Sequence, residues 1–284
     1  MDKPKFSGTA EASRIYFLPN LMTAGNLFCG FAAIMRCVEA KFTSRIEMLD
    51  PLYSVAKTPA QIYEQAIWFI LAAVVFDSLD GRLARLGGQE SLFGAEFDSL
   101  ADIVSFGIAP ALLVNFMILS PTESMPVFRL LGWFIGFVYL ACAAIRLARF
   151  NVITSPLLEQ DENTPKGEFL GLPVPAAAGT IASIVMMMNR LPTSDIPAIS
   201  LILPPFLLIV ALLMVSKIHY PSFKNIGWKT NIRPTSLLFI LMFFFLIYQF
   251  HYFAIGAVFI SYLFFGMFRH LLRLRKKPLG AAAE

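Results

Sequence analysis

Eight long apolar stretches constrain the fold of this chain more than any other feature. They run at about 16–38, 62–86, 92–119, 127–151, 172–190, 197–216, 235–250 and 252–272. About 20 apolar residues suffice for a helix to cross a bilayer, whereas membrane β-strands alternate over about 10 residues. With 57% hydrophobic and only 15% charged residues, a soluble domain of this length would expose a largely apolar surface. The sequence therefore predicts an all-α, polytopic membrane helical bundle with about eight transmembrane helices.

One integral membrane domain, 1–284, is the simplest organisation, because no linker separates two apolar bodies. The three cysteines lie in apolar stretches without a C-x-x-C pair, so neither a disulfide framework nor a cysteine metal site is expected. A net charge of +4 gives no reason to expect nucleic acid as a partner.

The distribution of lysine and arginine predicts the orientation. If both termini are cytoplasmic and the chain crosses eight times, 17 of the 23 basic residues face the cytoplasm. The six that face outward are Arg36, Lys41, Arg45, Lys57, Arg129 and Arg190. This asymmetry follows the positive-inside rule. We expect an integral protein of the cell (inner) membrane whose active site and termini face the cytoplasm.

Four aspartates stand inside the second and third spans, where charged residues by default mark function. Asp77 and Asp80 lie three residues apart on one helix, and Asp98 and Asp102 lie four apart on the next. Each pair therefore shares one helix face. A short turn after Gly87-Gly88 predicts antiparallel neighbours. Counted from that turn, Asp80 and Asp98 lie about 13 Å deep and Asp77 and Asp102 about 18–20 Å deep.

Four carboxylates at paired depths would repel one another unless they are protonated or bridged by cations. Dense, hard oxygen ligands suit Mg²⁺ or Mn²⁺. Two metals sharing four aspartates is an arrangement used in phosphoryl chemistry. The sequence thus predicts two divalent cations, Mg²⁺ or Mn²⁺, as cofactors.

Small and basic residues accompany the carboxylates. Gly81 and Gly94 share their faces, which would let helices or a bulky substrate approach closely. Arg85, one turn beyond Gly81, is placed to meet a phosphate. A buried ion-pair network would be the structural alternative, but two arginines can neutralise only part of four aspartates. A divalent-cation transporter and a non-catalytic lipid-binding protein are alternatives of other classes.

The spacing D-x-x-D-G-x-x-A-R, eight residues, G-x-x-x-D-x-x-x-D, from Asp77 to Asp102, resembles the signature of the CDP-alcohol phosphatidyltransferases without a mismatch. These membrane enzymes displace CMP from a CDP-linked lipid with an alcohol. The resemblance implies that Asp77, Asp80 and Asp98 bind two divalent metals, and that Asp102 is the general base and also a ligand. It further implies that Gly81, Arg85 and Gly94 line the CDP pocket.

Further segments resemble the branch of this family that makes phosphatidylserine. They are 18–27, 146–151, 171–175 and 215–224, so the resemblance covers about 15–225. The spans at about 235–272 would be additional C-terminal helices. The expected activity is transfer of the phosphatidyl group from CDP-diacylglycerol to L-serine, with release of CMP. Glycerol 3-phosphate, inositol phosphate or choline remain alternative acceptors, and the family resemblance suggests a homodimer in the membrane lipid.

Four polar residues outside the signature complete the candidate site. Asn26, in the middle of the first span, should face protein; it contacts either the nucleotide or another helix. Arg146, Arg149 and Asn151 end the fourth span on the side of the aspartates. Arginine forks fit the anionic oxygens of serine and of a diphosphate. These three residues are the predicted acceptor-binding or phosphate-binding group, although positive-inside anchoring would also account for the two arginines.

Overall fold

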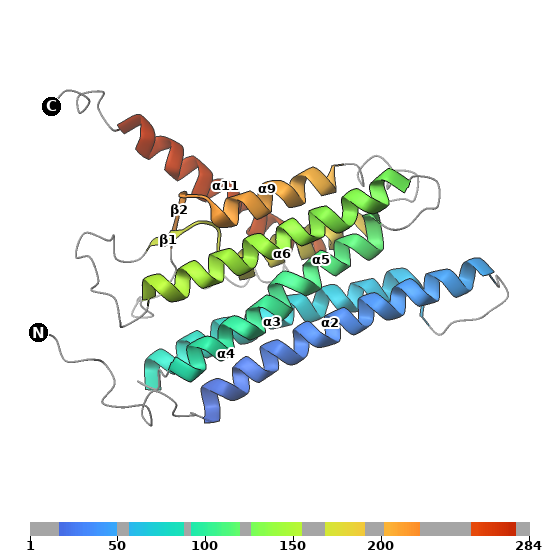
Figure 1. The fold of residues 1–284 in the computed structure, drawn as a ribbon, viewed down its shortest axis with the longest axis horizontal. Coiled ribbons are helices and arrows are strands. Elements are labelled where there is room, and N and C mark those ends of the chain that lie inside the picture. Colours follow the sequence, from blue (N-terminus) through green and yellow to red (C-terminus); the bar gives the residue numbers. More distant parts are fainter. Residues whose placement is uncertain are drawn as a thin grey trace, which may run out of the picture.

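The computed structural model describes residues 17–49, 57–87, 92–119, 126–154, 168–190, 202–221 and 251–276. Long helices running side by side make up the bundle (Figure 1). They are α2 (Phe17–Leu49), α3 (Pro59–Gly87), α4 (Leu92–Asp102) with its continuation, α6 (Pro126–Thr154), α7 (Val174–Met188), α9 (Leu203–Val215) and α11 (His251–Lys276). The first residues of α2 and the last residues of α11 lie at the same end of the bundle (Figure 1).

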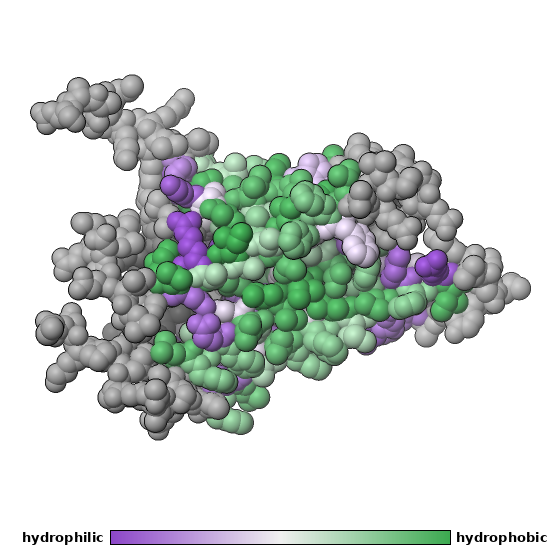
Figure 2. Space-filling view, viewed as in Figure 1, coloured by the Kyte–Doolittle hydropathy of each residue, from purple (hydrophilic) through white to green (hydrophobic). Residues whose placement is uncertain are grey.

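The predicted helical membrane architecture is confirmed. In the described residues, five helical segments are long and apolar enough to cross a membrane, and α7 and α9 are shorter apolar helices. The predicted span at 235–250 and the start of that at 197–216 lie outside the described residues, so eight crossings remain a prediction. Hydrophilic residues gather at the two ends, and a broad hydrophobic band lies between them (Figure 2). Such a band is what a lipid-facing surface requires.

The first helix differs from its predicted extent. We expected it to end near residue 38, where the apolar run stops, but α2 continues to Leu49. Across the end of that run, Arg36 and Glu39 form an ion pair three residues apart, at 2.5 Å. Farther along, the Ser44 hydroxyl donates to the Ala40 carbonyl. Local helical interactions therefore extend the helix after its apolarity ends.

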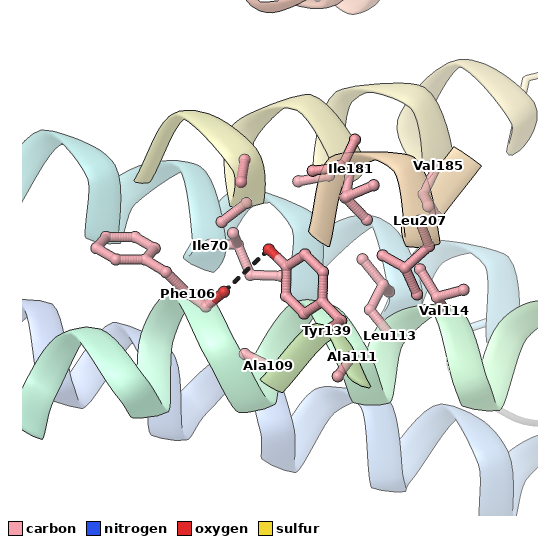
Figure 3. Packing of buried hydrophobic residues seen from close by; sticks show 14 of the residues in the cluster. Ile70, Phe106, Ala109, Ala111, Leu113, Val114, Tyr139, Ile181, Val185 and Leu207 are labelled. Atoms are coloured by element: carbon pink, nitrogen blue, oxygen red, sulfur yellow. Dashed lines mark hydrogen bonds between the residues drawn. The ribbon is translucent and has the colours of Figure 1, made fainter. Parts of the chain in front are cut away.

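The third span is continuous but not uniform. After α4 come the π-helix η1 (Ile103–Ile108), α5 (Ala109–Val114) and the π-helix η2 (Asn115–Leu119). Pro110 has no N–H to give the Phe106 carbonyl one turn earlier. The Tyr139 hydroxyl of α6 donates to that carbonyl instead, at 3.1 Å (Figure 3). A cross-helix hydrogen bond thus gives this buried carbonyl a donor that the proline cannot supply.

Two short strands were not expected in an all-α chain. β1 (Glu168–Leu170) pairs antiparallel with β2 (His219–Pro221), with Leu170 opposite His219. Gly171 follows with a φ of +78°, and its N–H donates to the Ile218 carbonyl at 2.8 Å. Pro173 then caps α7, with Pro175 in its first turn. These two prolines fix the entry to the fifth predicted span, because their ring geometry suits a helix start.

Helix packing leaves room beside the aspartates. α2 packs along α3 and also against α4 and η1. α3 meets the third span mainly at η1 and α5, beyond the aspartates. The expected antiparallel pair therefore opens where α4 begins, and this opening is the structural basis of the candidate site.

Candidate active site

Three of the four intramembrane aspartates converge. Asp77 comes from α3, and Asp98 and Asp102 come from consecutive turns of α4. One carboxylate oxygen from each lies within 4.8 Å of the others. At that separation two full charges repel by about 3 kcal/mol even at an effective dielectric constant of about 20. The shared helix face predicted for Asp98 and Asp102 is confirmed, and Asp77 of α3 joins them.

Asp80 lies beside this group rather than within it. It is buried, and the Thr23 hydroxyl of α2 donates to its Oδ2. Asp80 still acts electrostatically on Asp98. The fourth carboxylate is therefore held by a helix that the sequence analysis did not connect with it.

Asn26 holds Asp102 from the same face of α2. Its Nδ2 donates to Asp102 Oδ1 at 3.0 Å, and both residues are buried. The main-chain carbonyl of Asn26 accepts a hydrogen bond from the Ser105 hydroxyl of η1 at 2.9 Å. Gly30 permits this close packing, since a Cβ there would lie 2.6 Å from the Ser105 Cα. Of the two readings of Asn26, the structure supports the contact with another helix.

A cavity of about 440 Å³ opens on the carboxylates. Its volume lies within the range of small-molecule sites. The residues that line it come from α3, α4, α6 and α11 and from the start of α7: Val74, Asp77, Ser78, Gly81, Ala95, Asp98, Ser99, Asp102, Arg146, Leu147, Phe150, Asn151, Pro173, Pro175, Ala176, Phe259 and Tyr262. Charged groups from α3, α4 and α6 therefore face an apolar wall from α7 and α11.

Arg146 is the cationic side chain that lines this cavity among the described residues. It is only 8% exposed, it interacts electrostatically with Asp102 and Asp77, and its guanidinium lies 5.5 Å from the centroid of the Phe150 ring. One guanidinium cannot balance three carboxylates. The remaining negative charge in a low-dielectric site calls for further cations.

The donor set fits divalent metal ions. All the clustered side chains offer carboxylate oxygen, the ligand that Mg²⁺ and Mn²⁺ prefer. Asp98 Oδ1 and Asn26 Oδ1 are buried without a hydrogen-bond partner among the described residues. A buried oxygen without a donor is costly, and a metal ion would remove that cost at Asp98.

The other predicted site residues divide into three groups. Gly81, Arg146 and Asn151 line the cavity, and Asn151 Nδ2 donates to the Ser99 hydroxyl at 2.9 Å. Gly94 and Arg149 are half-buried but do not line it in the described part of the chain. The backbone of Arg85 lies in the last turn of α3, and its side chain is outside the described set.

Thr23, Phe259 and Tyr262 were not among the predicted site residues. Thr23 stands three residues before Asn26, on the same helix face of an apolar span, so that polar pair was a usable signal. Phe259 and Tyr262 are aromatic residues in an apolar helix, where nothing distinguishes them from ordinary packing residues. Only the tertiary structure brings them to the cavity.

Comparisons with known proteins agree with this geometry. A family model described as CDP-alcohol phosphatidyltransferase matches residues 16–218. The chain is similar to a CDP-diacylglycerol–serine O-phosphatidyltransferase of Helicobacter pylori, with 30% identity over 92% of this chain and 94% of that protein. An archaetidylserine synthase of Methanothermobacter thermautotrophicus is 30% identical over 75% of this chain and 73% of its own length. A CDP-diacylglycerol–serine O-phosphatidyltransferase of Saccharomyces cerevisiae is 34% identical over 61% and 55%, respectively.

Proposed function

Since this chain belongs to the CDP-alcohol phosphatidyltransferase family, we propose that it transfers the phosphatidyl group of CDP-diacylglycerol to L-serine. The products are phosphatidylserine and CMP. One observation carries the proposal: carboxylates from α3 and α4 and the guanidinium of Arg146 face one cavity inside a membrane-spanning bundle. That arrangement suits an anionic diphosphate attached to a lipid, because cations can neutralise both partners.

The proposed reaction is a single displacement at phosphorus. The serine hydroxyl oxygen forms a bond to the lipid-side phosphorus as the bond from that phosphorus to the CMP oxygen breaks. CMP leaves with the electron pair, and Asp102 takes the hydroxyl proton. Asn26 holds this carboxylate in place from α2. Inversion of configuration at phosphorus is the expected result, whereas retention would indicate a phosphatidyl-enzyme.

Asp77, Asp80, Asp98 and Asp102 would hold two divalent cations, Mg²⁺ or Mn²⁺. The clustering of three carboxylates and the partnerless Asp98 oxygen support this assignment. Bound there, such ions would neutralise the diphosphate and the departing CMP. The chain's own contribution is to hold the carboxylates at fixed positions through Asn26 and Thr23.

We expect Gly81 to contact the CDP-lipid, with Arg85 and Gly94 as further predicted contacts. Gly81 lines the cavity one turn beyond Asp77, where the absence of a side chain gives the nucleotide access. Arg146 is the cation best placed for an acceptor carboxylate or a phosphate, because its fork is buried against the cavity. Asn151 lines the same end of α6, and Arg149 remains a predicted partner one turn from Arg146.

Serine is favoured as the acceptor because two of the reported relatives are named for transfer to serine and the third is named archaetidylserine synthase. The test is a competition among alcohols. Purified protein with CDP-diacylglycerol and Mn²⁺ would receive L-serine, glycerol 3-phosphate, inositol phosphate or choline at equal concentration, with CMP and the lipid product measured. L-serine should give the fastest CMP release. Faster release with another alcohol would reject serine and leave the family assignment intact.

We also propose that the site and both termini face the cytoplasm of the cell (inner) membrane. The cavity is lined from the end of α3, from α4 and from the end of α6. These segments lie in the half of the bundle where α2 begins and α11 ends (Figure 1). A single cysteine at position 160 or 225 should resist an impermeant thiol reagent added from outside. Labelling from outside would reverse the orientation. The homodimer suggested by the family resemblance is testable by cross-linking in native membranes.

A further inference from the structure

The last helix of the described chain forms part of the cavity wall. Phe259 and Tyr262 of α11 line the cavity together with Asp102 and Arg146. The family model ends at residue 218, before α11 begins. The region that matches the family model, the shared region, therefore supplies the carboxylates and Arg146. α11, which lies outside that region, forms the opposite wall of the cavity.

Contacts at both ends of α11 fix its position. At the end far from the aspartates, the Tyr252 hydroxyl donates to Glu64 Oε1 at 2.9 Å, and Arg190 bonds both oxygens of Glu64 at 2.7 and 2.9 Å. Near the other end, Gly266 packs so closely that a Cβ would lie 2.2 Å from the Tyr220 ring of β2. α11 is thus tied to α3, α7 and β2 by specific contacts.

The middle of α11 packs on α7 with the same closeness. A Cβ on Gly179 would come within 2.3 Å of the Phe259 ring, and one on Gly256 within 2.8 Å of Met187 Sδ. Glycines let two helix backbones approach in a membrane without a hydrophobic driving force. This packing fixes the rotation of α11, so Phe259 and Tyr262 are held toward the cavity.

Tyr262 differs from its neighbours on that wall. The residues that α7 and its entry and α11 contribute to the lining are Pro173, Pro175, Ala176, Phe259 and Tyr262, and Tyr262 alone among these five has a polar side-chain atom. Its ring packs on Tyr220, with centroids 5.7 Å apart, and it interacts electrostatically with Arg146. A hydroxyl on an otherwise apolar wall of a cavity that a buried guanidinium also lines suits a small polar ligand with a carboxylate.

We propose that Tyr262 is a specificity-determining residue that contacts the acceptor, its hydroxyl donating to the acceptor carboxylate beside Arg146. The inference rests on the proposed serine-dependent function and assigns α11 to acceptor selection. A wall built outside the shared region can select the acceptor without altering the carboxylates that act on the diphosphate. The alignment with the Helicobacter pylori relative covers 262 of the 284 residues, so it extends into the 26-residue α11.

The test compares two variants of α11, each of which lacks one tyrosine hydroxyl. Y262F should raise the KM for L-serine about tenfold or more, the cost of one hydrogen bond to a charged group, and leave the KM for CDP-diacylglycerol within about twofold. It should also narrow the preference for L-serine over ethanolamine, which lacks the carboxylate. Y252F is the matched control, because the Tyr252 hydroxyl bonds Glu64 outside the cavity and the glycine packing of α11 on α7 and β2 is retained. It should leave both KM values unchanged. An unchanged KM for L-serine in Y262F, or a rise only for CDP-diacylglycerol, would overturn the proposal.

A second measurement does not depend on turnover. Y262C is made in protein that also carries Cys142→Ala, so the remaining cysteines, Cys29 and Cys37, are buried. A small water-soluble maleimide should then react at position 262, which lines the cavity. With Mn²⁺ and CDP-diacylglycerol present, L-serine should slow this labelling and ethanolamine should not. Equal labelling with and without L-serine would contradict the contact. If wild-type protein releases no CMP with L-serine but does so with another alcohol, the serine assignment fails, and the Y262F comparison is repeated with that alcohol.

Discussion

Asn26 offers the sharpest test of how the site is held together. Its amide donates to Asp102 at 3.0 Å inside the bundle, and it does not line the cavity. Asn26→Leu keeps a similar volume and removes that donor. The Ser105 hydroxyl still bonds the main-chain carbonyl of residue 26, so the backbone of α2 remains tied to η1. The substitution therefore isolates the loss of one hydrogen bond to the proposed base.

The expected magnitude follows from that bond. A hydrogen bond to a charged group contributes about 1.5–3 kcal/mol, and each 1.36 kcal/mol is tenfold in rate. We expect kcat to fall about 10-fold to about 150-fold in a CMP-release assay, with the KM values for both substrates within about twofold. Asn115→Leu is the matched control, because Asn115 also carries a buried amide oxygen without a partner in the described residues, but in η2, away from the cavity lining. A wild-type kcat for Asn26→Leu would refute the positioning role, as would an equal loss in Asn115→Leu.

Two further substitutions test other parts of the structure. Thr23→Val removes the hydroxyl that donates to Asp80. It should raise the Mn²⁺ concentration needed for half-maximal CMP release about 10-fold to 100-fold, as expected for a residue that orients a metal ligand. An unchanged metal requirement would show that Thr23 does not support a metal ligand. Tyr139→Phe leaves the Phe106 carbonyl without its cross-helix donor. It should lower the free energy of unfolding in detergent by about 0.5–2 kcal/mol and leave the metal requirement unchanged. Unaltered stability would mean that another group satisfies the carbonyl.

Much of the fold could be predicted because apolar length is a direct physical requirement of the bilayer. The extent of α2 could not, since local pairs such as Arg36–Glu39 carry the helix past its apolar run. The π-helix η1 was also missed. Pro110 was visible in the sequence, but the Tyr139 hydroxyl that satisfies the freed carbonyl comes from a helix about thirty residues away in the chain.

The candidate site, like the fold, could be predicted only in part. The spacing of Asp98 and Asp102 predicted their shared face, because helical periodicity is local. The separate position of Asp80 depends on Thr23 from another helix, and no spacing within the motif encodes that contact. Tyr262 reaches the cavity only because glycines on α7 and α11 set how the two helices pack, so its role could not be read from an apolar segment.

The central claim is that this chain couples CDP-diacylglycerol to L-serine through its clustered aspartates. The most direct measurement follows CMP and labelled phosphatidylserine in one reaction of purified protein with CDP-diacylglycerol, labelled L-serine and Mn²⁺, beside Asp98→Asn and an EDTA-treated sample. We expect equal amounts of the two products from the wild-type protein, and neither product from Asp98→Asn or in excess EDTA. CMP without phosphatidylserine, or undiminished products from Asp98→Asn, would contradict it.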